Sequence, residues 1–149
     1  MRNTIIIAVI SLMIIGCTKD KFTTKPQLKF KKVNKDVFAT GDELIITLSF
    51  TDKEGDLPGK FFIQRVTPSC LADTIFKDST ILPDFPVSPS LEGDIIVNYS
   101  VGTNNGHAGI MTLAPGECNS SDTCFFKFVL ADKAGNKSDT AVSSIIVIN

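Results

Sequence analysis

The strongest constraint on the fold is an alternation of apolar and polar residues that recurs along the chain after Pro26. In the segment 44–51, Leu44, Leu48 and Phe50 alternate with threonine and serine. Side chains of a β-strand point alternately to opposite faces, so this period of two predicts a strand with one buried face. Further strands are predicted at 27–33, 60–67, 94–101, 123–130 and 140–148.

Turn sequences that contain glycine separate these segments. They are Thr40-Gly41-Asp42, residues 54–59, Glu92-Gly93-Asp94, residues 102–109 and Ala134-Gly135-Asn136. Residues 81–90 hold three prolines and are expected to form an edge or a crossover, because proline cannot donate to a central ladder. Seven or eight short strands without a helical segment predict an all-β domain over residues 27–149, built as a two-sheet antiparallel sandwich.

Residues 1–16 have the features of an export signal. Arg2 precedes an apolar run from Ile5 to Ile15, which is too short to span a bilayer. The run ends in Ile14-Ile15-Gly16-Cys17, which resembles the lipobox of bacterial lipoproteins. The resemblance implies cleavage before Cys17 and attachment of lipid, palmitate included, to that cysteine. Residues 17–26 would then be the lipidated cysteine and a flexible tether. An ordinary signal peptide with an incidental cysteine is the alternative.

Two sequence blocks resemble the Ig-like or cadherin-like domains of small outer-membrane lipoproteins of Bacteroidota. The first block runs from Phe38 through Gly41-Asp42-Glu43-Leu44 to Gly55-Asp56-Leu57, and the second from Phe128 through Ala134-Gly135-Asn136 to Thr140. The resemblance implies an Ig-like sandwich of the fibronectin III or cadherin type, lipid-anchored in the outer membrane on its periplasmic or its cell-surface side. It implies no activity, because such sandwiches host many unrelated functions.

The sequence argues against an enzyme and against a nucleic-acid partner. Removal of residues 1–16 leaves a formal charge of −2, without the concentrated basic surface that phosphate binding needs. His107 is the single histidine and lies in the glycine-rich segment 102–109, and no nucleophile elbow or phosphate loop is present. We therefore expect a lipid-anchored envelope module, binding or structural, with a protein or glycan partner. The alternative is an accessory subunit, glycan-binding in one version, of an outer-membrane uptake or secretion complex.

Three cysteines remain besides Cys17, so the domain holds at most one internal disulfide. Cys118 and Cys124 enclose a short loop and are the favoured pair. A bridge from Cys70 to Cys124 or to Cys118 is the alternative, because Cys70 follows the third predicted strand, which pairs with the sixth in an Ig-like order.

A calcium site is a further hypothesis. Asp52, Glu54 and Asp56 alternate in the loop after the second long predicted strand, and Asp132 follows the sixth. These two strands run in the same direction in an Ig-like sandwich, so their exit loops share one pole. Carboxylates and a carbonyl, such as that of Asn136, are the ligands that calcium prefers. The competing interpretation treats the acids as turn residues in water, neutralised in part by Lys53, Lys60 and Lys133.

Three hydroxyl residues lie in short matches to the O-glycosylation pattern of Bacteroidota, in which aspartate precedes serine or threonine. They are Thr74, Ser79 and Thr140. The resemblance predicts exposed hydroxyl groups at these positions.

Overall fold

The computed structural model describes residues 23–57, 59–68, 77–84, 86, 88–102, 111–113 and 122–149. Within these ranges the regular structure is entirely β. The strands are β1 (Gln27–Val33), β2 (Val37–Phe38), β3 (Glu43–Asp52), β4 (Lys60–Val66), β5 (Lys77–Ile81), β6 (Leu91–Val101), β7 (Met111–Leu113), β8 (Asp122–Leu130), β9 (Ala141–Val142) and β10 (Ile146–Ile148). No helix in the described ranges is long and apolar enough to cross a membrane.

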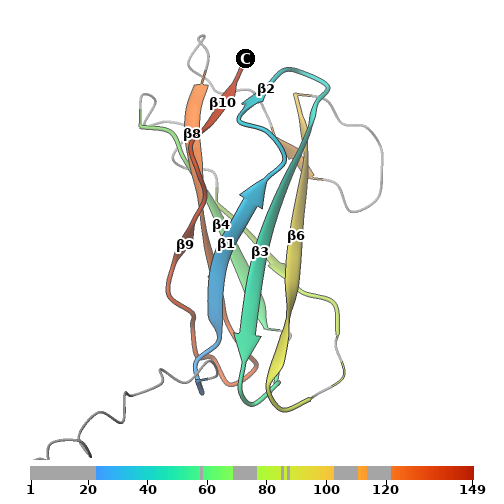
Figure 1. Cartoon of the computed structure of the whole chain (residues 1–149), viewed down its shortest axis with the longest axis vertical. Helices are drawn as coiled ribbons and strands as arrows, with labels where there is room; N and C mark the ends of the chain where they lie inside the picture. Colours follow the sequence, from blue (N-terminus) through green and yellow to red (C-terminus); the bar gives the residue numbers. More distant parts are fainter. Residues whose placement is uncertain are drawn as a thin grey trace, which may run out of the picture.

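The strands form two sheets, as the alternating pattern predicted (Figure 1). One sheet has the order β1-β3-β6-β7, and the other has the order β2-β10-β8-β4-β5 with β9 also paired to β8. Most neighbours are antiparallel, and β10 with β2 and β6 with β7 are parallel pairs. The long strands follow the long axis of the molecule, with the start of β1 at the lower end of the view and the C-terminus at the upper end.

The core lies between the sheets and is formed by the inward residues of β3, β4, β6 and β8. A row of aromatic rings runs through it: the ring centroids of Tyr99 and Phe126 are 5.6 Å apart, those of Phe126 and Phe128 6.1 Å, and those of Phe128 and Phe61 5.9 Å. All four side chains are almost completely buried. The side chain of Tyr99 therefore belongs to the core between the sheets.

The last predicted strand, 140–148, is divided into β9 and β10. At the break, the Ser143 N–H donates to the Phe126 carbonyl at 2.9 Å, and the Ser143 hydroxyl accepts from the Phe126 N–H at 2.9 Å. The serine side chain thus takes the place of a backbone acceptor. The strand ends there because the Phe126 N–H of β8 is already bonded to the serine hydroxyl and is no longer available to a backbone carbonyl.

The turn predicted at Glu92-Gly93-Asp94 is wrong, because Gly93 lies inside β6 and pairs with Phe50 of β3. A Cβ atom on Gly93 would stand 3.0 Å from the Phe50 ring, so the glycine makes room for an aromatic side chain. The turn comes earlier, where Ser90 has a φ of 60°. The proline-rich segment does link an edge strand, β5, to the opposite sheet, as expected.

Candidate metal centre

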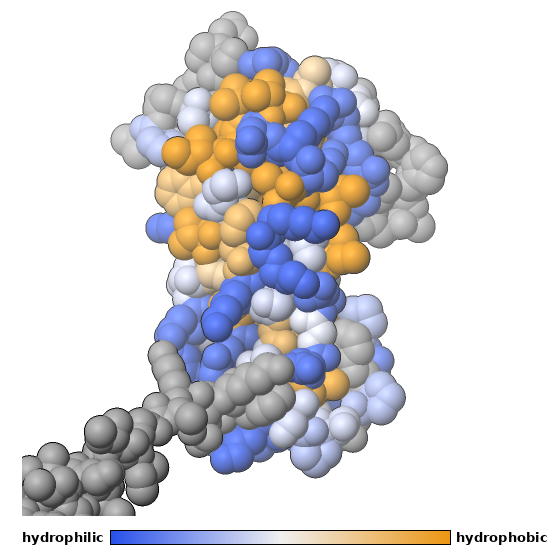
Figure 2. Space-filling model, in the orientation of Figure 1, coloured by the Kyte–Doolittle hydropathy of each residue, from blue (hydrophilic) through white to orange (hydrophobic). Residues whose placement is uncertain are grey.

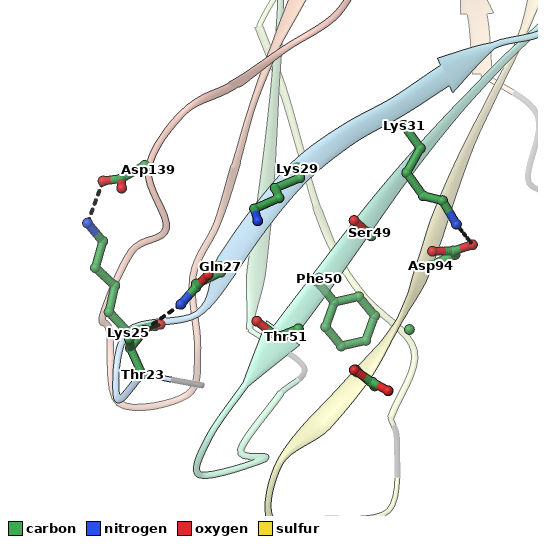
Figure 3. Close-up of a pocket in the computed structure, with 12 residues that line it drawn as sticks. Thr23, Lys25, Gln27, Lys29, Lys31, Ser49, Phe50, Thr51, Asp94 and Asp139 are labelled. Atoms are coloured by element: carbon green, nitrogen blue, oxygen red, sulfur yellow. Dashed lines mark hydrogen bonds and ion pairs between the residues drawn. The ribbon is translucent and has the colours of Figure 1, made fainter. Parts of the chain in front are cut away.

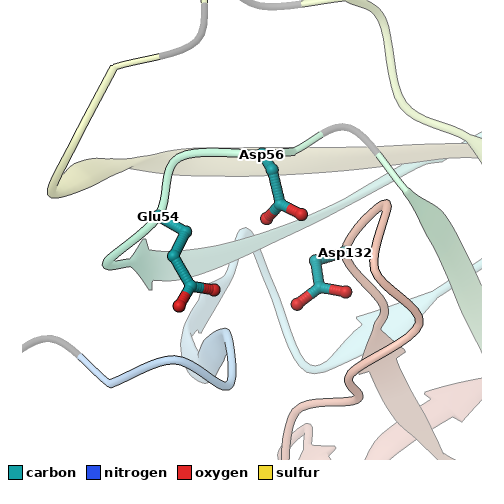
Figure 4. Close-up of side chains that lie close together, drawn as sticks. All are labelled: Glu54, Asp56 and Asp132. Atoms are coloured by element: carbon teal, nitrogen blue, oxygen red, sulfur yellow. The ribbon is translucent and has the colours of Figure 1, made fainter.

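Three carboxylates from two loops converge (Figure 4) at the lower pole of the molecule as drawn in Figure 1, where β3 and β8 end. Glu54 and Asp56 lie in the loop between β3 and β4, and Asp132 follows β8. One oxygen of each side chain lies within 4.8 Å of the other two. The structure thus brings together three of the four residues that the sequence singled out for calcium.

The fourth residue, Asp52, is the last residue of β3 and is completely buried. Its Oδ2 accepts a hydrogen bond of 3.0 Å from the Asp56 N–H. Its Oδ1 is buried and has no hydrogen-bond partner within the described part of the chain, and the same is true of Asp56 Oδ1. Burial, followed by the negative charges of Asp56 and Asp132, raises the pKa of Asp52 above its ordinary value.

Asp132 is held by its own turn. It is buried, and its Oδ1 and Oδ2 accept hydrogen bonds of 2.7 and 2.8 Å from the backbone N–H and side-chain amide of Asn136. The Asn136 carbonyl, expected as a ligand, accepts a hydrogen bond of 3.0 Å from the Asp132 N–H. Asn136 therefore fixes the orientation of the Asp132 carboxylate.

Close packing fixes the loop that carries Glu54 and Asp56. Leu57 is completely buried and belongs to the core. Gly55 has a φ of 66°, and a Cβ atom there would stand 1.9 Å from the Ser88 carbonyl oxygen. A Cβ atom on Gly59 would stand 1.9 Å from the Ala131 carbonyl oxygen. The loop therefore contacts a neighbouring backbone at both Gly55 and Gly59, and only glycine fits at these two positions.

Within the described residues, lysine side chains do not form ion pairs with this cluster. The ion pairs found there include Lys25–Asp139, Lys31–Asp94, Lys35–Asp42 and Lys133–Asp84. None of them includes Asp52 or one of the three clustered carboxylates, and Lys133 pairs with Asp84 at 3.8 Å. Among the residues that the structure describes, no ion pair joins Lys53, Lys60 or Lys133 to this cluster.

A polar groove of about 1260 Å³ lies beside the start of β1 (Figure 3). Its lining side chains come mainly from β1, β3 and β6: Thr23, Lys25, Gln27, Lys29, Lys31, Ser49, Phe50, Thr51, Glu92, Asp94 and Asp139. Lys25 pairs with Asp139 at 2.5 Å and Lys31 with Asp94 at 2.8 Å, whereas Lys29 has no ion-pair partner in the described part of the chain. Hydroxyl, amide, ammonium and carboxylate groups thus lie within one open surface.

Sequence reasoning did not identify this groove. The alternating pattern does mark Gln27, Lys29, Ser49 and Thr51 as outward-facing residues. Their assembly depends on the register that places Gln27 opposite Thr51 and Lys29 opposite Ser49. No local sequence signal sets that register.

The other predicted site residues are placed as follows. Cys124 is completely buried on β8. Ser79 on β5 and Thr140 before β9 are exposed, as glycosylation would require. Outside the described residues lie Cys17, Cys70, Thr74, His107 and Cys118. The disulfide and its pairing therefore stay predictions.

No family model matches this chain, and no curated protein matches it. Among solved structures, it is similar to the sporulation control protein Spo0M from Bacillus subtilis. The two chains share 11% sequence identity with a TM-score of 0.44. The match covers 85% of this chain and 50% of that one, so this chain spans about half the length of Spo0M.

Proposed function

We propose that this chain is an exported, lipid-anchored and non-enzymatic binding module of the bacterial outer membrane. The observation that carries the proposal is the apolar run that ends in Ile14-Ile15-Gly16-Cys17, with nine residues between Cys17 and the start of β1. Two or more acyl chains on Cys17 would give stable membrane attachment, whereas one chain gives only marginal binding. The sandwich would then be displayed on a short tether that joins it at its lower pole.

The strand order supports the Ig-like part of this proposal. In Ig-type sandwiches the first, second and fifth strands share one sheet, and the third, sixth and seventh share the other. Here β1, β3 and β6 lie in one sheet, and β4, β8 and β10 lie in the other. The edge strand β5 beside β4 corresponds to the additional strand of variable-type domains.

The distribution of hydrophobic residues favours a protein partner. Figure 2 shows the molecule in the orientation of Figure 1, and hydrophobic residues gather on the upper half of the visible face, away from the end where β1 begins. The exposed large hydrophobic residues of the described ranges are all aliphatic, among them Val37 (53% exposed) and Ile145 (63% exposed). Val37 lies on β2, and Ile145 directly precedes β10, its pairing partner. Aliphatic patches suit protein surfaces, whereas sugar rings stack on flat aromatic side chains.

The test of the anchor is metabolic labelling with a palmitate analogue in a bacterial host, followed by membrane fractionation. We expect Cys17→Ser to abolish the label and to release the domain from the membrane. The matched control is Cys70→Ser, which removes a thiol but leaves residues 14–17 intact and should retain the label. Label that persists in Cys17→Ser would refute the anchor.

The polar groove supports a second candidate function, that of a glycan-binding accessory subunit. Its hydroxyl, amide and charged groups can hydrogen-bond sugar hydroxyls without aromatic stacking. We expect Gln27→Ala and Lys29→Ala to weaken binding of envelope oligosaccharides in a calorimetric titration, and Lys127→Ala on β8 to leave it unchanged. Equal affinity of all three variants would remove the groove from consideration.

A further inference from the structure

The spacing of the clustered carboxylates matches the size of one coordination sphere. Calcium binds oxygen at about 2.3–2.6 Å, so two ligands of one ion lie at most about 5 Å apart. One oxygen each of Glu54, Asp56 and Asp132 falls within 4.8 Å of the others. In Figure 4 the three side chains point toward a common space between the two loops. The geometry therefore allows one ion to contact all three.

A second observation, independent of the spacing, indicates that a cation belongs here. Asp52 is completely buried beside the cluster, and its Oδ1 lacks a hydrogen-bond donor within the described part of the chain. A buried carboxylate oxygen without a partner is costly, and charged groups cost more than neutral ones. Asp56 Oδ1, within the cluster itself, is likewise buried without a hydrogen-bond partner in that part of the chain. A cation among these groups would supply the missing compensation.

We propose that Glu54, Asp56 and Asp132 bind a single calcium ion, with the carboxylate of Asp52 adding negative charge behind them. All candidate ligands are oxygen atoms, which favours calcium or magnesium over metals that prefer nitrogen and sulfur. Calcium accepts six to eight ligands in irregular geometry, whereas magnesium demands a near-ideal octahedron. Three carboxylates from two loops, completed by water, fit the more permissive ion.

The ion would link two parts of the fold at the tether end. Glu54 and Asp56 follow β3 of one sheet, and Asp132 follows β8 of the other. The adjacent Lys53 N–H donates to the carbonyl of Thr23, four residues before β1, at 3.4 Å. Calcium would therefore join the two sheets at the pole where the tether enters. This inference concerns the domain alone and does not depend on the lipid anchor.

The experiment uses the chain from Thr18 to Asn149, which retains every strand of both sheets. After removal of metal with a chelator, calcium chloride and magnesium chloride are titrated by calorimetry, and thermal melts are recorded with each ion and with chelator. The variants are Glu54→Gln and Asp56→Asn. The matched control is Asp94→Asn, an acid in an exposed ion pair on β6. Glu54 is exposed, so Glu54→Gln keeps the test valid even if another variant folds poorly.

We expect one calcium per chain, a higher melting midpoint with calcium than with chelator, and weaker binding of magnesium. Affinity is set largely by the number of charged ligands, so Glu54→Gln and Asp56→Asn should each weaken calcium binding by about tenfold or more. Asp94→Asn should leave the affinity unchanged. Identical melts with calcium and chelator would overturn the proposal. So would calcium binding that both cluster variants retain, or equal binding of the two ions.

Discussion

Gly59 lies where the loop bearing Glu54 and Asp56 meets the segment bearing Asp132, and we predict that Gly59→Ala disrupts this junction. The added methyl group would stand 1.9 Å from the Ala131 carbonyl oxygen and 2.7 Å from the Asp132 carbonyl carbon. Ordinary contact begins near 3.4 Å, so the two backbones must separate by about 1.5 Å. That movement breaks the hydrogen bond from the Ala131 N–H to the Lys60 carbonyl, which is 2.8 Å long.

The expected loss of stability follows from these contacts. Overpacking at a tight site costs about 1–3 kcal/mol, and a lost backbone hydrogen bond adds about 1 kcal/mol. We therefore expect Gly59→Ala to lower the free energy of unfolding by about 3 kcal/mol, a large part of the 5–15 kcal/mol that is usual for a domain. The chain has no tryptophan, so circular dichroism in a urea titration is the appropriate measurement.

Gly135→Ala is the matched control for this prediction. Gly135 has a φ of 90°, and no atom lies within 4 Å of the place that an added methyl group would take, so its substitution costs only backbone strain, about 1–2 kcal/mol. The reasoning would be refuted if Gly59→Ala cost less than Gly135→Ala. Steric conflict, rather than a special backbone conformation, would then not be what requires glycine at position 59.

Three further predictions concern the core, the cysteines and the acid stability. Phe126 is completely buried between Tyr99 and Phe128, so Phe126→Ala should cost about 4 kcal/mol and Phe126→Leu about 1 kcal/mol in urea titrations; a loss below 2 kcal/mol for the alanine variant would contradict the packing. Non-reducing peptide mapping should find Cys118 linked to Cys124, and a peptide bridged through Cys70 would contradict that pairing. The pKa of Asp42 is lowered from its ordinary value of 3.8, first by a hydrogen bond from the Ala39 N–H and then by one from the Lys35 ammonium. The ionised Asp42 carboxylate therefore stabilises the fold above pH 3.8, and this stabilisation is lost as the pH falls through the lower pKa of the folded state. Asp42→Asn should therefore flatten the fall of the urea midpoint below about pH 4, and an unchanged slope would speak against it.

The long strands were predictable because each carries its own signal. β1 coincides with the predicted segment 27–33, and β3, β4 and β8 each begin or end within a residue or two of the prediction. In each strand the alternation of apolar and polar residues reflects one buried face. This pattern can be read from the strand's own sequence, whichever strands lie beside it. The position of Asp132 beside the loop that bears Glu54 and Asp56 was also predictable, because the prediction required only the order of the strands.

The short elements were not predictable for the opposite reason. β2 has two residues, and its place depends on a parallel pairing with β10 at the far end of the chain. The break between β9 and β10 depends on one serine hydroxyl that meets a specific N–H on β8. The sequence Glu92-Gly93-Asp94 has the composition of a turn, but glycine is present at position 93 because the Phe50 ring of the adjacent strand packs against it. Each of these features is determined by a tertiary contact that no local window contains.

A calcium site can be distinguished from ordinary turn acids by asking which contacts of these carboxylates the turns alone explain. Asp132 caps its own turn through Asn136, and Asp52 Oδ2 accepts from the Asp56 N–H, so the preference of turns for aspartate explains both of these contacts. It does not explain Asp52 Oδ1, which is buried without a donor in the described ranges. Nor does it explain Glu54, whose longer side chain makes no such local hydrogen bond among the described residues and yet points at Asp56 and Asp132. Repulsion should turn an exposed glutamate away from two other carboxylates. Glu54 and the inner oxygen of Asp52 are therefore the two groups on which the calcium hypothesis depends.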